Sequence, residues 1–169
     1  GRPIFISDNN GYDWQFINGE TASGVQVEHT YTQPGDYSEV LKITDAAGRV
    51  DYDFALVQVL DPTTPDQYVP GIHIAYEPTY DIQPGDAITF TVRAFGFDGG
   101  EDIWDFGDGS PEVRTQSGKN SDPHAPDGYT FIEHAYAKPG HYLVHVYREN
   151  KDGKQGHAHL HVSIDNLEI

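Results

Sequence analysis

The chain has 169 residues and a formal net charge of −17, from 27 acidic and 10 basic side chains. A protein that binds nucleic acid or an anionic membrane needs a basic face, so this balance argues against both partners. The chain has no Cys, which excludes disulfides and thiolate chemistry, and no apolar run approaching the ~20 residues that span a bilayer.

Short apolar runs separated by turn residues, with 18 Gly and 11 Pro, predict an all-β chain of many short strands. The chain also has no Met and no signal peptide. We therefore interpret it as a processed piece of a longer polypeptide.

The strongest signal is an internal repeat. Val27–Tyr31 and Gln33–Tyr37 are followed 105 positions later by Ile132–Tyr136 and Lys138–Tyr142, and this offset holds without a gap to Val59 and Ile164. Upstream of these segments, Trp14-Gln15-Phe16 corresponds to Trp104-Asp105-Phe106, but at an offset of only 90. Repeat two therefore carries about 15 extra residues, and their Ser, Asn, Asp, Pro and Gly content predicts a long loop insertion near 112–129.

The repeat divides the chain into three parts. We expect repeat one over residues 1–61, a Pro-rich, semi-rigid linker over 62–70, and repeat two over 71–169. In repeat one, Pro3–Ser7 is interpreted as a remnant of the second strand, and the first strand is missing, shortened or supplied by an upstream domain. In repeat two, Ile72–Tyr76 and Ala87–Arg93 are expected to form the first two strands.

Three motifs of repeat two resemble those of the PKD domain family, whose members are Ig-like β-sandwiches. They are Trp104-Asp105-Phe106-Gly107-Asp108-Gly109, His134-Ala135-Tyr136 and Pro139-Gly140-His141-Tyr142. Repeat one departs from the pattern, because it lacks the Gly-Asp-Gly turn and has Glu39 where the pattern has Val. The resemblance implies two PKD-type antiparallel β-sandwiches in tandem, the first shortened at its N-terminus. Because repeat one lacks the Gly-Asp-Gly turn, the resemblance implies no role for a turn carboxylate in repeat one.

The matched residues have structural interpretations. Trp14 and Trp104 are expected in the core, and Tyr37 and Tyr142 at a tyrosine corner. His29 and its counterpart in repeat two precede that corner, where a hydrogen-bonding role is favoured over catalysis.

Strand alternation places the histidines of the last two strands together. Ala158, Leu160, Val162 and Ile164 are predicted to face the core, so the intervening histidines face outward, next to His145 on the neighbouring strand. Such an exterior patch could bind a transition metal such as zinc, or be a merely solvated polar face. The acidic loop at 98–102 is a candidate for Ca²⁺. No cofactor is expected to be required, and the candidate metal ligands are His145, His157, His159, Asp98 and Asp102.

The positions of repeat one that correspond to the histidines at 145, 157, 159 and 161 are apolar. They are Val40, Tyr52, Phe54 and Leu56. An apolar patch of this kind marks an interface. We expect this face to pack on repeat two or on an upstream domain. The alternative is that a bulge at Glu39 reverses the facing, so that these residues point into the sandwich.

The sequence has no catalytic motif, so no enzyme activity is expected. The resemblance implies a non-catalytic accessory module of a secreted polysaccharide-degrading or similar enzyme, extracellular or at the cell surface, that acts as a spacer and binds carbohydrate. The alternative is a structural, protein-interaction or adhesion module that packs on an upstream domain of the same polypeptide. The expected partners are that domain and a polysaccharide, and the module is expected to be a monomer. The candidate carbohydrate-binding residues are Arg114, Lys119, His124, Tyr129, Tyr147 and Arg148.

Overall fold

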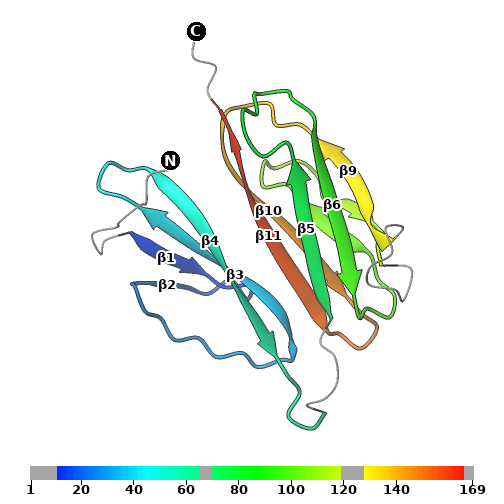
Figure 1. The fold of residues 1–169 in the computed structure, drawn as a ribbon. Helices are drawn as coiled ribbons and strands as arrows, with labels where there is room; N and C mark the ends of the chain where they lie inside the picture. Colours follow the sequence, from blue (N-terminus) through cyan, green and yellow to red (C-terminus); the bar gives the residue numbers. More distant parts are fainter. Residues whose placement is uncertain (1–10, 65–69, 119–127, 166–169) are drawn as a thin grey trace.

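The computed structural model describes residues 11–64, 70–118 and 128–165, and all regular structure within these ranges is β (Figure 1). Repeat one contains β1 (Tyr12–Gln15), β2 (Thr21–Ser23), β3 (Gly35–Thr44) and β4 (Val50–Val59). They form one antiparallel layer, in which β3 pairs with β4 along its whole length and with β1 at its C-terminal end. The expected remnant at Pro3–Ser7 lies outside the described residues.

Repeat two is a complete two-layer sandwich. Its first layer contains β5 (Gly71–Glu77), β6 (Ile88–Phe95) and β9 (Thr130–His134), with β6 in the middle. The second contains β7 (Asp102–Asp105), β8 (Val113–Thr115), β10 (Gly140–Glu149) and β11 (Gln155–Ile164). The order β8-β7-β10-β11 matches β2-β1-β3-β4, so the single layer of repeat one corresponds to the second layer of repeat two.

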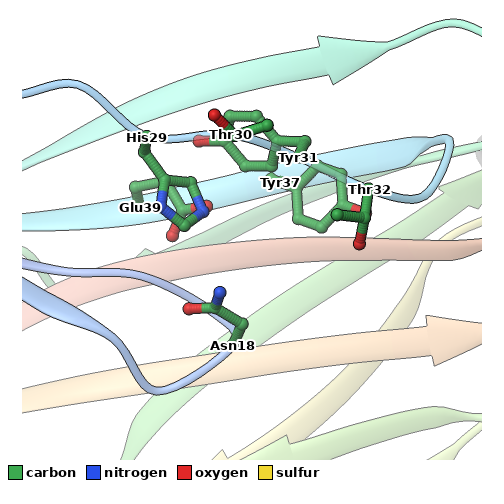
Figure 2. Close-up of a pocket in the computed structure, with 7 residues that line it drawn as sticks. All are labelled: Asn18, His29, Thr30, Tyr31, Thr32, Tyr37 and Glu39. Atoms are coloured by element: carbon green, nitrogen blue, oxygen red, sulfur yellow. The ribbon is translucent and has the colours of Figure 1, made fainter.

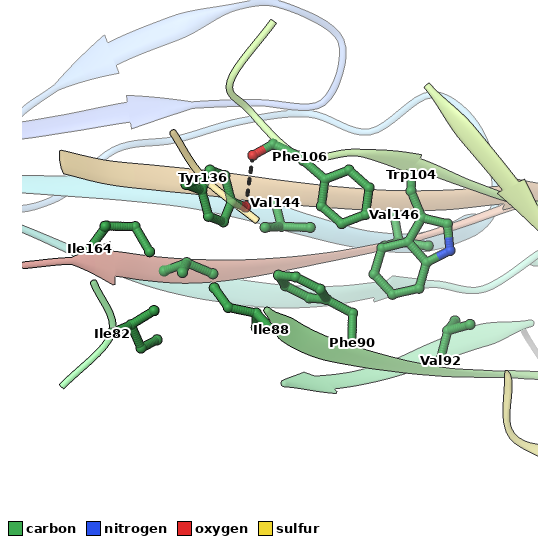
Figure 3. Close-up of a cluster of buried hydrophobic side chains, with 11 residues drawn as sticks. Ile82, Ile88, Phe90, Val92, Trp104, Phe106, Tyr136, Val144, Val146 and Ile164 are labelled. Carbon is green, nitrogen blue, oxygen red and sulfur yellow. Dashed lines mark hydrogen bonds between the residues drawn. The ribbon is translucent and has the colours of Figure 1, made fainter. Parts of the chain in front are cut away.

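The core of repeat two lies between its two layers (Figure 3). Trp104 and Phe106 stack on each other, and Phe90 of the opposite layer meets both rings edge-on. Each large apolar side chain buried here contributes about 1.5–3 kcal/mol. The alternation predicted for β11 is confirmed, because Ala158, Val162 and Ile164 are buried and Leu160 packs against the core.

The last hairpin of each repeat closes in the same way. Asp45 Oδ1 accepts hydrogen bonds from the backbone N–H groups of Ala47 and Arg49, and Gly48 adopts a positive φ of 79°. In repeat two, Asn150 and Gly153 occupy the matching positions, with a φ of 77° at the glycine. An Asx side chain followed by a left-handed glycine is a turn signal, and it fixes the register of both hairpins.

The insertion predicted as a loop begins differently from the prediction. Val113–Thr115 forms β8, which pairs with β7, and Thr115 Oγ1 accepts a hydrogen bond of 2.9 Å from the Trp104 indole. Ser117 Oγ accepts another from the backbone N–H of Ala94. Residues 113–115 therefore correspond to β2 of repeat one and are tied to the core, whereas the turn-rich composition had suggested that the loop insertion begins near residue 112. Residues 119–127 lie outside the described residues.

The two repeats are joined by a short stretch of backbone pairing. The N-terminal end of β3 pairs in parallel with β11, through Gly35 with Gln155 and Asp36 with Gly156. These backbone pairs join the layer of repeat one to the second layer of repeat two as one sheet. Figure 1 shows the two repeats lying side by side, with β3 and β4 beside β10 and β11.

Candidate functional site

An aromatic chain recurs in both repeats. In repeat two, His134 stacks on Phe106 at 4.0 Å and meets Tyr136 edge-on at 4.8 Å. In repeat one, His29 stacks on Phe16 at 4.0 Å and meets Tyr31 at 4.7 Å. These histidines are packed structural groups, in line with the sequence-based interpretation.

The turn carboxylate of the family motif has a structural role. Asp108 lies 2.8 Å from His134 Nε2. Burial alone would raise the pKa of Asp108, but hydrogen bonds from Ser110 and His134 lower it overall. Repeat one lacks the Gly-Asp-Gly turn, yet Glu20 Oε2 lies 3.2 Å from His29 Nδ1. The turn carboxylate itself is absent from repeat one, where Asn18 stands in its place, and the carboxylate near His29 is the exposed Glu20, two positions later in the motif.

The histidines of β10 and β11 form a layer between the two repeats. The rings of His145 and His159 stack at 4.4 Å, and those of His145 and His157 at 5.3 Å. Across the junction, Phe54 stacks on His159 at 5.7 Å and Tyr52 meets His161 at 5.0 Å. The prediction that these histidines form an exterior patch is wrong, because repeat one covers the face on which they lie.

Burial controls the ionisation of this histidine layer. It lowers the pKa of His145 and of His157 to about 4, and the pKa of His159 to about 3. For His157 and His159 the neighbouring imidazoles lower the pKa further, because protons on adjacent rings repel. The layer is therefore neutral at physiological pH.

Four of the five candidate metal ligands have other side chains as partners, whereas Nδ1 of His159 is buried without a hydrogen-bond partner among the described residues. His145 Nε2 lies 3.0 Å from His157 Nδ1, so the two rings share a hydrogen bond. Asp98 pairs with Lys151, and Asp102 Oδ1 accepts a hydrogen bond of 3.0 Å from Arg148. No cluster of three or more His, Asp or Glu residues suited to a metal is present in residues 11–64, 70–118 and 128–165. Zinc and Ca²⁺ binding remain predictions from the sequence.

The apolar positions of repeat one lie on one face of its sheet, and repeat two covers only part of that face. Val40 is buried, and Tyr52 and Phe54 contact histidines of repeat two, whereas Leu56 is 74% exposed. The β3–β4 ladder runs through Glu39 without a bulge, so the facing is the one that the alternation predicts. Of the two neighbours considered for this face, repeat two is the one the structure places there.

The candidate carbohydrate-binding residues contact different groups. Arg114 is exposed and pairs with Glu101, and Tyr147 stacks beside His145. Tyr129 lies under the Arg93 guanidinium. Arg148 is buried and bonded to Asp102, Gly99 and Ser117, which marks it as a structural residue. Lys119 and His124 lie outside the described residues.

A groove in repeat one was missed by the sequence analysis. It has a volume of about 350 Å³ and is lined by Trp14, Phe16, Val25, Gln26, Val27, His29, Tyr31, Glu39, Ala55 and Val57. A smaller pocket next to it shares His29, Tyr31 and Glu39, and Figure 2 shows these side chains on one side of the layer. Trp14, expected in the core, is only half-buried, because it forms part of the groove wall.

Glu39 is the unusual residue of the groove. This residue is only 2% exposed. Its Oε2 atom accepts a 2.7 Å hydrogen bond from the backbone N–H of Ile17. Its Oε1 atom has no hydrogen-bond partner among the described residues. Burial raises the pKa of Tyr31 beside it, and so do the charge of Glu39 and a side-chain hydrogen bond between Tyr31 and Glu39. The available sequence signal was Glu39 itself, at a position where repeat two has Val144.

The described residues thus define a tandem of Ig-like β-modules, the first of them shortened. The PKD domain family matches the chain twice, over residues 6–59 and 71–163. The chain therefore belongs to the PKD domain family, whose members are generally non-catalytic modules typical of extracellular proteins.

A solved structure of fibronectin(III)-like modules of Clostridium thermocellum CbhA is also similar to this chain, with 14% identity and a TM-score of 0.38. The match covers 98% of this chain and 85% of that one. Within the described ranges, no helix has the length and apolar character needed to cross a membrane.

Proposed function

We propose that this chain is a non-catalytic accessory module of a secreted, polysaccharide-degrading or similar enzyme, and that it acts there as a rigid spacer. The observation that supports the spacer role is the junction between the repeats, where backbone pairing and a buried imidazole–aromatic layer occur together. Relative motion is the default for linked domains unless their interface is extensive and apolar.

Close packing at the junction supports this role. A Cβ atom on Gly71 would lie 2.9 Å from Asp36 Oδ2, and one on Gly156 would lie 2.8 Å from the Phe97 ring. A side chain at Gly71 would require the Asp36 carboxylate of repeat one to shift, so glycine favours the close approach of the two repeats there, whereas the contact of Gly156 with Phe97 lies within repeat two. Both glycines lie at the start of strands that lead away from the junction.

The absence of Cys allows a direct test of rigidity. Spin labels on S23C and E133C, at exposed positions of the two repeats, should give one narrow distance distribution by pulsed electron resonance. In F54K, which removes the ring stacked on His159, the distribution should broaden. A broad distribution in the chain with native Phe54 would contradict the spacer role.

Carbohydrate binding is the second part of the proposed function. Arg114 and Tyr129 are described residues near the insertion that offer a cation and an aromatic ring. Affinity electrophoresis against neutral and anionic polysaccharides tests this part separately, because a rigid spacer need not bind any of them. Retardation by one polymer that is lost in R114A/Y129A would support it, and equal mobility in every gel would contradict it.

A further inference from the structure

The histidine layer contains a second close pair of imidazoles, near the C-terminal end of β11. His141 of β10 and His161 of β11 occupy diagonal positions of the antiparallel ladder, where long side chains reach one another. The His141 Nδ1 atom lies 2.8 Å from the His161 Nε2 atom, and the ring centroids are 5.0 Å apart. A neutral imidazole carries a lone pair on one of its two nitrogens, so this pair brings two possible metal ligands together.

The two close imidazole pairs of the layer differ in their access to solvent. His157, which is hydrogen-bonded to His145, is only 5% exposed, so that pair is shielded from the water that an ion needs to complete its ligand shell. In contrast, His141 is exposed and the side chain of His161 is 18% exposed. An ion held between His141 and His161 can therefore take its remaining ligands from solvent.

A carboxylate of repeat one orients the His161 ring. Asp51 Oδ1 of β4 lies 3.7 Å from His161 Nδ1, and the ring of Tyr52 meets the His161 ring at a centroid distance of 5.0 Å. The facing carboxylate favours a proton on Nδ1, and this tautomer leaves the lone pair of Nε2 directed at His141. Histidines that bind metals usually have such a group at the other ring nitrogen, where it fixes the ring and makes it a stronger ligand.

The spacing of the two nitrogens favours particular metals. Imidazole nitrogens bind transition metals at about 2.0–2.1 Å, so two nitrogens 2.8 Å apart subtend an angle of about 85–90° at the ion. That angle fits neighbouring ligands of a square-planar or tetragonal complex, whereas a tetrahedral ion needs a separation of about 3.3 Å. Cu²⁺ and Ni²⁺ prefer the first geometry and Zn²⁺ the second, so the pair is better suited to Cu²⁺ or Ni²⁺.

We propose that His141 and His161 bind a Cu²⁺ or Ni²⁺ ion at the junction of the two repeats, and that Asp51 positions His161. Water completes the ligand shell, because the described residues contain no group of three or more side chains suited to a metal. Binding replaces the hydrogen bond between the rings: His141 takes the tautomer with its proton on Nε2, and its exposed ring turns so that both lone pairs meet at the ion. Because Asp51 belongs to repeat one and both ligands to repeat two, the bound ion strengthens the contact between the repeats.

The test uses the full ¹⁵N-labelled chain at about pH 7.5, where an ordinary imidazole is neutral. Two protein ligands hold an ion weakly, so the chain freed of metal is the reference and added Cu²⁺ is the probe. Because Cu²⁺ is paramagnetic, the first portions added should broaden the amide signals around His141 and His161 before others. An ion that binds the folded chain also stabilises it, so excess Cu²⁺ should raise the thermal midpoint, and Zn²⁺ at the same concentration should raise it less.

Four variants separate ligands, positioning residue and controls. H141N changes an exposed side chain and should abolish both effects. D51N should weaken Cu²⁺ binding by about tenfold, as expected when the partner of a ligating histidine is lost. Electron resonance of the bound Cu²⁺ should show two nitrogen ligands in D51N as in the native chain, because Asp51 is not itself a ligand. D53N, which changes the next acidic side chain of β4, and H73N, on β5, should leave the affinity unchanged.

Three results would overturn the proposal. Equal Cu²⁺ affinity in H141N and in the native chain would show an adventitious ion only. Broadening that starts at the N-terminus, or that is spread evenly over the histidines of the chain, would show the same. Loss of binding in H157N but not in H141N would place the ion in the buried part of the layer instead.

Discussion

Acidification should destabilise this chain through the histidine layer. The native pKa of His145 and of His157 is about 4, and an unfolded imidazole titrates near ~6.5. Between these values the unfolded chain binds more protons than the native one, so stability falls as the pH drops through that window. On going from about pH 7.5 to about pH 5.5, each of these imidazoles should cost about 1.3 kcal/mol of unfolding free energy. With His159 included, the three histidines should cost about 4 kcal/mol.

The groups around the layer modify this effect without reversing it. Asp105 opposes the lowering of the His145 pKa, and Asp51 Oδ1 lies 3.7 Å from His161 Nδ1. Asp36, at the junction, has a pKa raised by burial, so its protonation partly offsets the loss as the pH falls. Desolvation is the first cause of the lowered pKa at all three histidines, so the direction of the effect is a loss of stability.

The assay is urea denaturation followed by tryptophan fluorescence at the two pH values. H157N should reduce the pH-dependent loss by about a third. H73N is the matched control, because His73 lies on an exposed position of β5, and it should leave the loss unchanged. An equal unfolding free energy at both pH values, or an undiminished loss in a variant that lacks all three histidines, would refute the reasoning.

Four further predictions follow from packing and charge. F90A should lower the unfolding free energy by about 3–5 kcal/mol, because it removes the ring that packs on Trp104 and Phe106. Urea denaturation measures the unfolding free energy, and F131A, which changes an exposed side chain, is the control. D102A should cost about 3–5 kcal/mol because it leaves the buried Arg148 guanidinium unpaired. K151A, which breaks an exposed ion pair, should leave the thermal midpoint unchanged. Chelation of divalent cations by EDTA should also leave the midpoint unchanged, because the carboxylates of the 98–102 loop already face cationic side chains. A fall in the midpoint with EDTA would instead favour a resident metal.

The fold was largely predictable from the sequence because local and duplicated signals agree. The motifs around Trp104 and Tyr142 recur at Trp14 and Tyr37, and both tyrosine hydroxyls donate to the backbone four residues upstream, at 2.9 Å and 2.8 Å. Period-two alternation also identified which side chains of β11 enter the core. These features depend on neighbours in sequence, so a single chain reveals them.

The sites were harder to predict because they depend on contacts between distant segments. Alternation placed His157 and its neighbours on the outer face of repeat two, but it could not show that repeat one covers that face. The edge pairing of Gly35 with Gln155 joins positions far apart in the chain and carries no local motif. Glu39 was noted as a departure from the family pattern, yet only the open groove shows why a carboxylate at that position matters.

The contact between Phe54 and His159 joins two copies of the same position in the repeat. Two identical repeats meeting in this way would form an isologous contact, with like on like. Divergence of this position into a phenyl ring and an imidazole leaves one titratable ring in the contact. A pair of second repeats would stack imidazole on imidazole, a combination that repels once both rings are protonated. Because Phe54 cannot take up a proton, the junction between the repeats cannot place two adjacent positive charges at this pair.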